Sequence, residues 1–155
     1  MKPAVERVVT ALRAAGVSSD VTEFAQSTRT AEEAAAAVGC AVGQIVKSLV
    51  FLAGGSPILA LVSGVNRLDT AKLAAATGAR ITRADADAVR SATGFSIGGV
   101  PPVAHATPLV TYLDRDLTQY EQVWAAAGTP NAVFPITPAE LERIASARVI
   151  DLAAE

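Results

Sequence analysis

Residues 44–51 read QIVKSLVF and residues 58–62 read ILALV, and the turn-forming sequence GGSP occupies positions 54–57 between them. Short runs of this kind, rich in apolar residues and bounded by turn residues, are typical of strands buried on both faces of a sheet. Two such strands joined by a short glycine-rich connection form a hairpin. The segment therefore predicts a hairpin at the centre of a β-sheet.

Helix and strand signals alternate on both sides of this hairpin, and no Ser/Pro/Gly-rich linker divides the chain. Capping residues help to place the helices: Thr30 begins a capping box with Glu33, Asp69 suits an N-cap, and Pro138 suits a first helical turn. We predict helices at 3–15, 30–38, 70–76, 84–92 and 117–127 and from Thr137 onward, and further strands at 20–24, 109–113 and 132–136. This order predicts one mixed α/β domain spanning residues 1–155.

Composition narrows the function classes. The chain has 155 residues and a net charge of −2, and its lysines and arginines are scattered, which argues against the broad basic face of a duplex-binding protein. Contact with a strand end or a single nucleotide needs only one or two cations and stays open. Cys40 is the one cysteine and His105 the one histidine, so we expect no disulfide, no metal and no cofactor. Neither a secretory signal nor a bilayer-spanning apolar run is present, which predicts a cytoplasmic protein without membrane contact.

Lys47 is the most informative side chain. Alternation along a strand places it on the same face as Ile45, Leu49 and Phe51, which are bulky and apolar. An ammonium group there needs an exit to water, a carboxylate, or an anionic ligand. Two interpretations follow, a lysine that reaches water at a sheet edge and a lysine that binds phosphate.

The sequence GGVPP at 98–102 predicts a loop, because glycines free the backbone while prolines fix it and remove amide donors. The carbonyl groups of Gly99, Val100 and Pro101 stay available as acceptors, so such a loop suits a cation such as an α-ammonium group. An ordinary surface turn is the alternative interpretation. The pattern is neither a dinucleotide-binding nor a P-loop motif.

Conventional nucleophilic catalysis has no candidate here. The chain has no Gly-x-Ser-x-Gly elbow, and no histidine is near Cys40 in sequence. His105 could assist a proton transfer or serve as a structural hydrogen-bonding residue. Asp69 and Asp114 are interpreted as caps or turn residues.

Three segments together resemble the YbaK/prolyl-tRNA-synthetase-associated editing family: IVKSLVF at 45–51, LDTAKLA at 68–74 and TGFSIGGVPP at 93–102. Their order and spacing match as well, and the resemblance extends from about Val17 to near the end of the chain. It implies a strongly curved mixed β-sheet, close to a barrel, with helices packed outside. It also implies an aminoacyl-tRNA deacylase that acts on the 3′ end of a mischarged tRNA, with an aminoacyl-tRNA synthetase as a possible partner.

The resemblance also implies roles for individual residues. The counterpart of Lys47 anchors a phosphate of the terminal nucleotides, and the loop that begins at Gly98 positions the aminoacyl end. A ribose hydroxyl of the substrate and an oriented water then replace a protein nucleophile. The further substrate-binding residues implied are Phe24, Ser48, Thr93, Gly99, Val100, Pro101, Pro102 and His105.

The chain departs from the family pattern at Ala104, where glycine is usual, and at 128–131, where some relatives have two glycines followed by an acidic residue. These departures leave open whether cysteine, alanine or another small amino acid is cleaved, and tRNA-Pro is the expected tRNA. Two other functions also stay open: a non-catalytic module that binds a nucleotide or tRNA end and docks on a synthetase, and a hydrolase of small amino-acid esters or amides.

Overall fold

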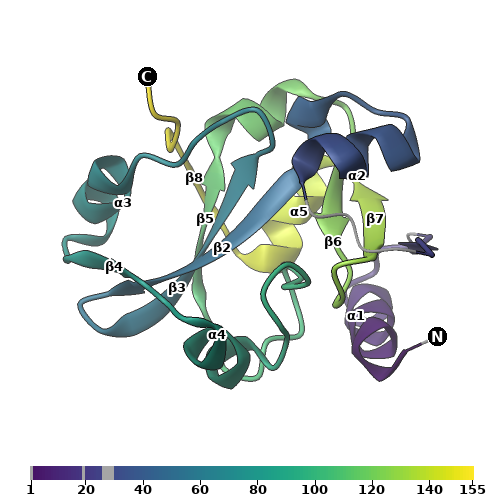
Figure 1. Cartoon of the computed structure of the whole chain (residues 1–155), viewed down its shortest axis with the longest axis horizontal. Coiled ribbons are helices and arrows are strands. Elements are labelled where there is room, and N and C mark those ends of the chain that lie inside the picture. Colours follow the sequence, from purple (N-terminus) through teal and green to yellow (C-terminus); the bar gives the residue numbers. More distant parts are fainter. Residues whose placement is uncertain (1, 19, 26–29) are drawn as a thin grey trace.

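The computed structural model describes residues 2–18, 20–25 and 30–155, and Figure 1 shows how its elements are arranged. The α-helices are α1 (Pro3–Ala14), α2 (Ala31–Val38), α3 (Thr70–Thr77), α4 (Ala86–Thr93) and α5 (Pro138–Ala145). The 3₁₀ helices are η1 (Val42–Gln44) and η2 (Arg115–Gln119). The strands are β1 (Thr22–Glu23), β2 (Val46–Ala53), β3 (Ser56–Ser63), β4 (Ile81–Arg83), β5 (Val110–Asp114), β6 (Val123–Ala126), β7 (Ala132–Ile136) and β8 (Arg148–Ile150).

The predicted hairpin is confirmed as β2 and β3, which pair antiparallel from Val46↔Ser63 to Ala53↔Ser56. They form the middle of a five-stranded mixed sheet with the order β4-β2-β3-β5-β8, in which β3 and β5 run parallel. A second sheet has the order β1-β7-β6, and a bridge between Ile45 and Trp124 connects the two. The mixed α/β class is therefore confirmed, and the described strands form two sheets and no closed barrel.

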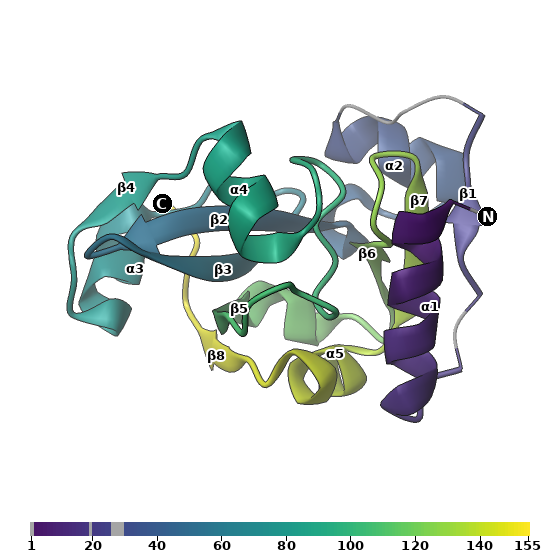
Figure 2. The ribbon, with the colours of Figure 1, turned by 90° about the horizontal axis from the view of Figure 1, so that it is seen from below.

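Both faces of β3 are covered, as an uninterrupted apolar strand requires. Leu59 and Leu61 are buried against apolar residues of α1, α4 and α5, whereas Ile58, Ala60 and Val62 pack with Leu73 of α3 on the other face. Figure 2 shows α1 alongside the second sheet, at the other end of the molecule from α3. The hairpin is thus fixed from both sides, and so are the side chains that project from β2.

The predicted caps are present. Thr30 accepts a hydrogen bond from the Glu33 amide at 3.1 Å, Asp69 accepts from Ala71 and Lys72, and Thr137 accepts from Glu140. These bonds satisfy amide groups that have no partner inside the helix. The starts of α2, α3 and α5 were therefore predictable from short sequence signals.

The predicted helix at 117–127 is wrong. Residues 115–119 form η2 and residues 123–126 form β6, which pairs antiparallel with β7. Val123, Ala125 and Ala127 are fully buried while Trp124 and Ala126 are half-buried, which is the alternation of a strand. Trp124 and Tyr120 are consequently not a helical pair. Pairing with β7 and burial of alternate residues outweigh a helix propensity that is worth only tenths of a kcal/mol per residue.

None of the helices in the described part of the chain is long and apolar enough to cross a bilayer.

Candidate functional site: a cavity beside the open edge of a central strand

One edge of β2 lacks a strand partner over part of its length. Gly64 donates its amide to Ile45 at 2.7 Å, so the odd-numbered residues of β2 bond to β3 and the main-chain groups of Val46, Ser48 and Val50 point the other way. On that side β4 pairs only with residues 51–53, and the one β-bridge to the second sheet among the described residues is the one between Ile45 and Trp124. Among the described residues no strand fills the space between them.

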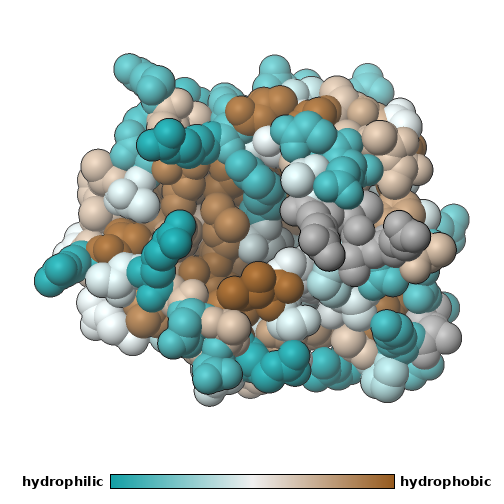
Figure 3. Space-filling model, viewed as in Figure 1, coloured by the Kyte–Doolittle hydropathy of each residue, from teal (hydrophilic) through white to brown (hydrophobic). Residues whose placement is uncertain are grey.

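A cavity of about 570 Å³ lies at this gap. Its walls come from β2, from the loop after α4, from α2, and from the second sheet with its 128–131 turn. Figure 3 shows the face of Figure 1 with apolar side chains gathered in a hollow left of centre, bordered by hydrophilic ones. A volume of this size suits a small ligand or the end of a polymer, and an apolar wall with a few polar groups is typical of binding sites.

Lys47 lines the cavity and is half-buried. Its Nζ atom donates a hydrogen bond to the main-chain carbonyl of Asn66, and no carboxylate pairs with it among the described ion pairs. An ammonium group has three hydrogens, so two stay available to a ligand. The structure therefore places a cation at the cavity without neutralising it.

The neighbouring Ser48 also lines the cavity. Its Oγ atom is buried and has no hydrogen-bond partner in the described structure. A buried hydroxyl without a partner costs free energy, which is a reason for a ligand or a water molecule to bind beside it.

The predicted loop approaches Lys47 from the other wall: Gly98 and Val100 line the same cavity. Gly98 has a φ of +88°, which favours glycine. At Gly99 a Cβ would lie 2.7 Å from the Cα of Thr129, so only glycine allows the loop to pack on the 128–129 backbone. The loop is thus held against the 128–131 turn, and both contribute to the cavity wall.

Pro101, Pro102 and His105 do not line the cavity. The Nε2 atom of His105 is 2.6 Å from the Pro101 carbonyl oxygen. Burial lowers the pKa of the imidazole below its ordinary value, and the bond to Pro101 opposes that shift. One of the three carbonyl groups predicted to be free acceptors is therefore already used.

Thr93 and Phe24, which the resemblance implies as pocket residues, do not line the cavity. Thr93 is fully buried at the end of α4, where its hydroxyl donates to the Val89 carbonyl at 2.7 Å and accepts from the Phe95 amide at 3.0 Å. Phe24 donates its amide to the Asn131 main-chain carbonyl at 2.7 Å, and its own carbonyl accepts a bond from the Asn131 side-chain Nδ2 atom at 2.9 Å, in the turn that contacts the loop. Both residues fix the surroundings of the cavity.

Several cavity residues were missed by the sequence analysis. Arg83 lies at the end of β4, opposite Phe51 in the register, and Trp124 comes from β6. Thr129 and Pro130 line the far wall, and Ile97 is 55% exposed at the rim. Ile97 belongs to the recognised motif at 93–102 and could have been found, whereas no local signal marks Arg83 or Trp124.

Charge at the cavity has one sign. Lys47 and Arg83 are the charged side chains among the described lining residues, although the chain as a whole has a net charge of −2. An apolar cavity whose charged groups are cations attracts an anionic ligand.

Comparison with known proteins gives consistent results. The family model for the aminoacyl-tRNA editing domain matches residues 25–144. The Bacillus subtilis protein YwhH is 33% identical over 132 residues, which is 84% of both chains. EbsC of Enterococcus faecalis, named as a candidate Cys-tRNA(Pro)/Cys-tRNA(Cys) deacylase, is 29% identical over 74% of this chain and 76% of its own.

Solved structures agree as well. A crystal structure described as a candidate trans-editing enzyme for prolyl-tRNA synthetase superposes with a TM-score of 0.96 and 51% identity, covering 100% of this chain and 99% of the other. The motifs at 45–51 and 93–102 lie inside the segment that the family model matches. The chain belongs to the aminoacyl-tRNA editing domain family.

Proposed function

We propose that the cavity beside β2 binds the aminoacylated 3′ end of a mischarged tRNA and that the protein hydrolyses the ester bond found there. The observation that carries this proposal is that Lys47, whose ammonium has no carboxylate partner among the described ion pairs, lines the same cavity as Gly98 and Val100. A phosphate of the terminal nucleotides meets the ammonium group, and the aminoacyl group lies against the loop. The family membership and the names of the relatives support the reaction class.

The described lining contains no histidine, cysteine, aspartate or glutamate. The chain therefore offers no side chain there that acts as a base near neutral pH, and the proton of the attacking water goes to the substrate. Water adds to the ester carbonyl carbon, the bond to the ribose oxygen breaks, and that oxygen ends as a hydroxyl group beside a free amino acid. A neighbouring ribose hydroxyl assists this transfer, while the protein supplies position and charge neutralisation.

Substrate identity is the finer part of the proposal. We propose that a small amino acid, cysteine or alanine, is removed from tRNA-Pro after the synthetase has released it. Pocket shape alone discriminates by about 1 to 3 kcal/mol per methylene group, so neighbouring small amino acids are expected to be cleaved at measurable rates. The mildly acidic chain favours a synthetase partner that adds tRNA affinity.

The test is a deacylation assay with Cys-tRNA-Pro, Ala-tRNA-Pro, correctly charged Pro-tRNA-Pro and small amino-acid esters. We expect hydrolysis of at least one mischarged tRNA and little of Pro-tRNA-Pro. Lys47→Ala should lower kcat/KM about 10- to 100-fold, because a hydrogen bond to a charged group contributes about 1.5–3 kcal/mol. Lys2→Ala is the matched control, since Lys2 is exposed at the start of α1 and does not line the cavity.

Two outcomes would contradict the proposal. A Lys47→Ala protein with the wild-type rate would remove the phosphate anchor. Binding of charged tRNA that protects the ester would indicate a non-catalytic binding module in its place.

A further inference from the structure

The Lys47 side chain is held in place by a part of the chain far from it in sequence. Its Nζ atom donates to the main-chain carbonyl of Asn66, in the loop that connects β3 with α3. A free lysine side chain has four rotatable bonds and loses rotamer entropy when it is fixed. The bond to Asn66 removes part of this cost before a ligand arrives.

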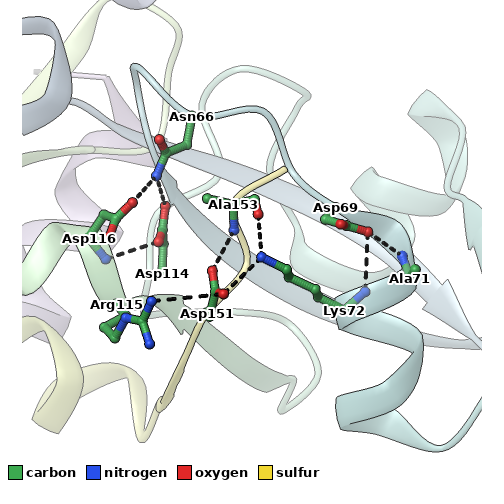
Figure 4. A network of polar contacts seen from close by, with 9 residues as sticks. All are labelled: Asn66, Asp69, Ala71, Lys72, Asp114, Arg115, Asp116, Asp151 and Ala153. Carbon is green, nitrogen blue, oxygen red and sulfur yellow. Dashed lines mark hydrogen bonds and ion pairs between the residues drawn. The ribbon is translucent and has the colours of Figure 1, made fainter. Parts of the chain in front are cut away.

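The position of that carbonyl depends in turn on the Asn66 side chain. Its Nδ2 atom donates to Asp114 at 2.8 Å and to Asp116 at 2.8 Å, so both hydrogens of the amide are used (Figure 4). The Asn66 side chain must turn its Nδ2 atom, and not its Oδ1 atom, towards the two carboxylates, because only the amide nitrogen can donate a hydrogen bond.

Asp114 is more buried and accepts more hydrogen bonds than a turn residue after a strand requires. It is fully buried at the end of β5, and its carboxylate also accepts the amides of Ser63 at 3.0 Å and Asp116 at 3.0 Å. No cation pairs with it among the described ion pairs. Burying a carboxylate is costly unless hydrogen bonds compensate, and here the compensating donors are the Asn66 side chain and the amides of Ser63, at the end of β3, and Asp116, in η2.

The opposite side of this loop is fixed too. The amide of Ala154 donates to the Arg67 carbonyl at 2.8 Å and the amide of Asp69 donates to Leu152 at 2.8 Å, next to the Lys72–Asp151 ion pair drawn in Figure 4. The loop is therefore held between β5 and the C-terminal segment, and Asn66 has little freedom to move.

We propose that Asn66 is a positioning residue: Asp114 and Asp116 bind its side chain so that its main-chain carbonyl directs the Lys47 ammonium into the cavity. The proposal rests on the proposed function, in which Lys47 binds a substrate phosphate. It assigns a role in the reaction to three residues that do not line the cavity. The contacts of Asn66 with Asp114 and Asp116 position the Lys47 ammonium group before the substrate phosphate binds to it.

A double-mutant cycle tests this, with deacylation of the preferred mischarged tRNA as the readout. Asn66→Ala should lower kcat/KM about three- to tenfold, mainly through a higher KM, because the ammonium is no longer held. In a Lys47→Ala background the same change should have almost no further effect, since the group being positioned is gone. Asp116→Ala is the milder variant in case Asn66→Ala does not fold, and Asp116→Asn, which keeps an acceptor oxygen, should restore most of the activity.

A spectroscopic measurement gives an answer independent of activity. In NMR spectra of the protein the hydrogens of the Lys47 amine should exchange slowly with water, and Asn66→Ala or Asp116→Ala should accelerate that exchange. Thr137→Ala, which removes the N-cap of α5 away from the cavity, is the control for a general loss of stability and should leave the Lys47 signal unchanged.

The outcomes separate the two proposals. Wild-type activity in Lys47→Ala alone would overturn the proposed function. If Lys47→Ala lowers kcat/KM and Asn66→Ala then lowers it by its full factor again in the Lys47→Ala background, the positioning role is overturned and the proposed function stands. Unchanged exchange of the Lys47 amine in both network variants would also overturn the positioning role.

Discussion

The Nε2 atom of His105 lies 2.6 Å from the carbonyl oxygen of Pro101, four residues earlier in the chain. A carbonyl group only accepts hydrogen bonds, so Nε2 carries the hydrogen and the neutral ring needs no second proton. The imidazole thus supports the Gly98–Pro102 loop and does not line the cavity.

This arrangement predicts a pH dependence of stability. Burial lowers the pKa of folded His105 below its ordinary value of 6.5, so below that pH the unfolded chain binds more protons. The contribution of the neutral His105 ring to the free energy of unfolding is fully present above pH 6.5, and it is lost as the pH falls towards the pKa of the folded state. His105→Gln still donates to Pro101 but does not titrate, so its free energy of unfolding should decline less between pH 7 and 5. Denaturant unfolding at several pH values measures this, and parallel curves for the two proteins would contradict the assignment.

Gly99→Ala should separate the loop from the 128–131 turn. The added Cβ would lie 2.7 Å from the Thr129 Cα and 2.9 Å from the Gly128 carbonyl oxygen, and backbone atoms cannot yield as side chains do. We expect a loss of about 1–3 kcal/mol of stability, as for overpacking in a core, together with a large loss of deacylation. Gly78→Ala is the control, because Gly78 has a positive φ and no atom within 4 Å of its Cβ position. It should lose stability and keep kcat/KM; equal activities of the two variants would refute the close contact.

Arg83→Gln should weaken binding of tRNA without stopping the reaction. Arg83 is exposed at one end of the cavity, so its contribution is screened and worth at most about 1 kcal/mol, a factor of roughly five in KM. The dependence of KM on salt concentration should also become shallower, because one cation fewer contacts phosphate. Arg80→Gln, an exposed arginine outside the cavity lining, should change neither quantity. Identical salt dependence in all three proteins would exclude Arg83 from the binding site.

Arg7→Ala should loosen the loop from its other end. The Arg7 guanidinium of α1 lies 4.5 Å from the centroid of the Phe95 ring and donates to the Gly94 carbonyl at 3.1 Å. A cation–π contact and one hydrogen bond predict a loss of about 1–2 kcal/mol in the free energy of unfolding. Urea denaturation checks this, and Arg13→Ala on the same helix, for which the described structure records no side-chain hydrogen bond or ion pair, should lose less. A smaller loss in Arg7→Ala than in Arg13→Ala would show that α1 does not anchor this loop.

Prediction from sequence succeeded where the signal is local and failed where pairing partners are distant. The hairpin of β2 and β3, the start of α2 at Thr30 and the strand at 132–136 follow from neighbouring residues. The segment 117–127 has acceptable helix formers throughout, and only its pairing with β7 makes part of it a strand. The short strands β4 and β8 were missed, because three residues contain no readable period.

The site divides in the same way. Lys47 was recognised as an unusual cation on an apolar strand, and the Gly98 loop as a backbone-rich binding segment, and both line the cavity. Asp114 was interpreted as a turn or cap; it does cap η2, but its burial and its bonds to Asn66 were invisible in the sequence.

The amino-acid sequence by itself determined the alternation of helices and strands around a central hairpin, the caps that begin its helices, and the presence of a lysine where a strand should be apolar. Each of these depends on residues a few positions apart, whose geometry the backbone period dictates. Only the tertiary structure decided that β2 keeps an open edge, that Arg83 and Trp124 reach the same cavity as Lys47, and that Asn66 holds the amine. These relationships join residues that are 19 to 77 positions apart in the sequence. The packing of the two sheets brings them together, and no local conformational preference of the chain does so.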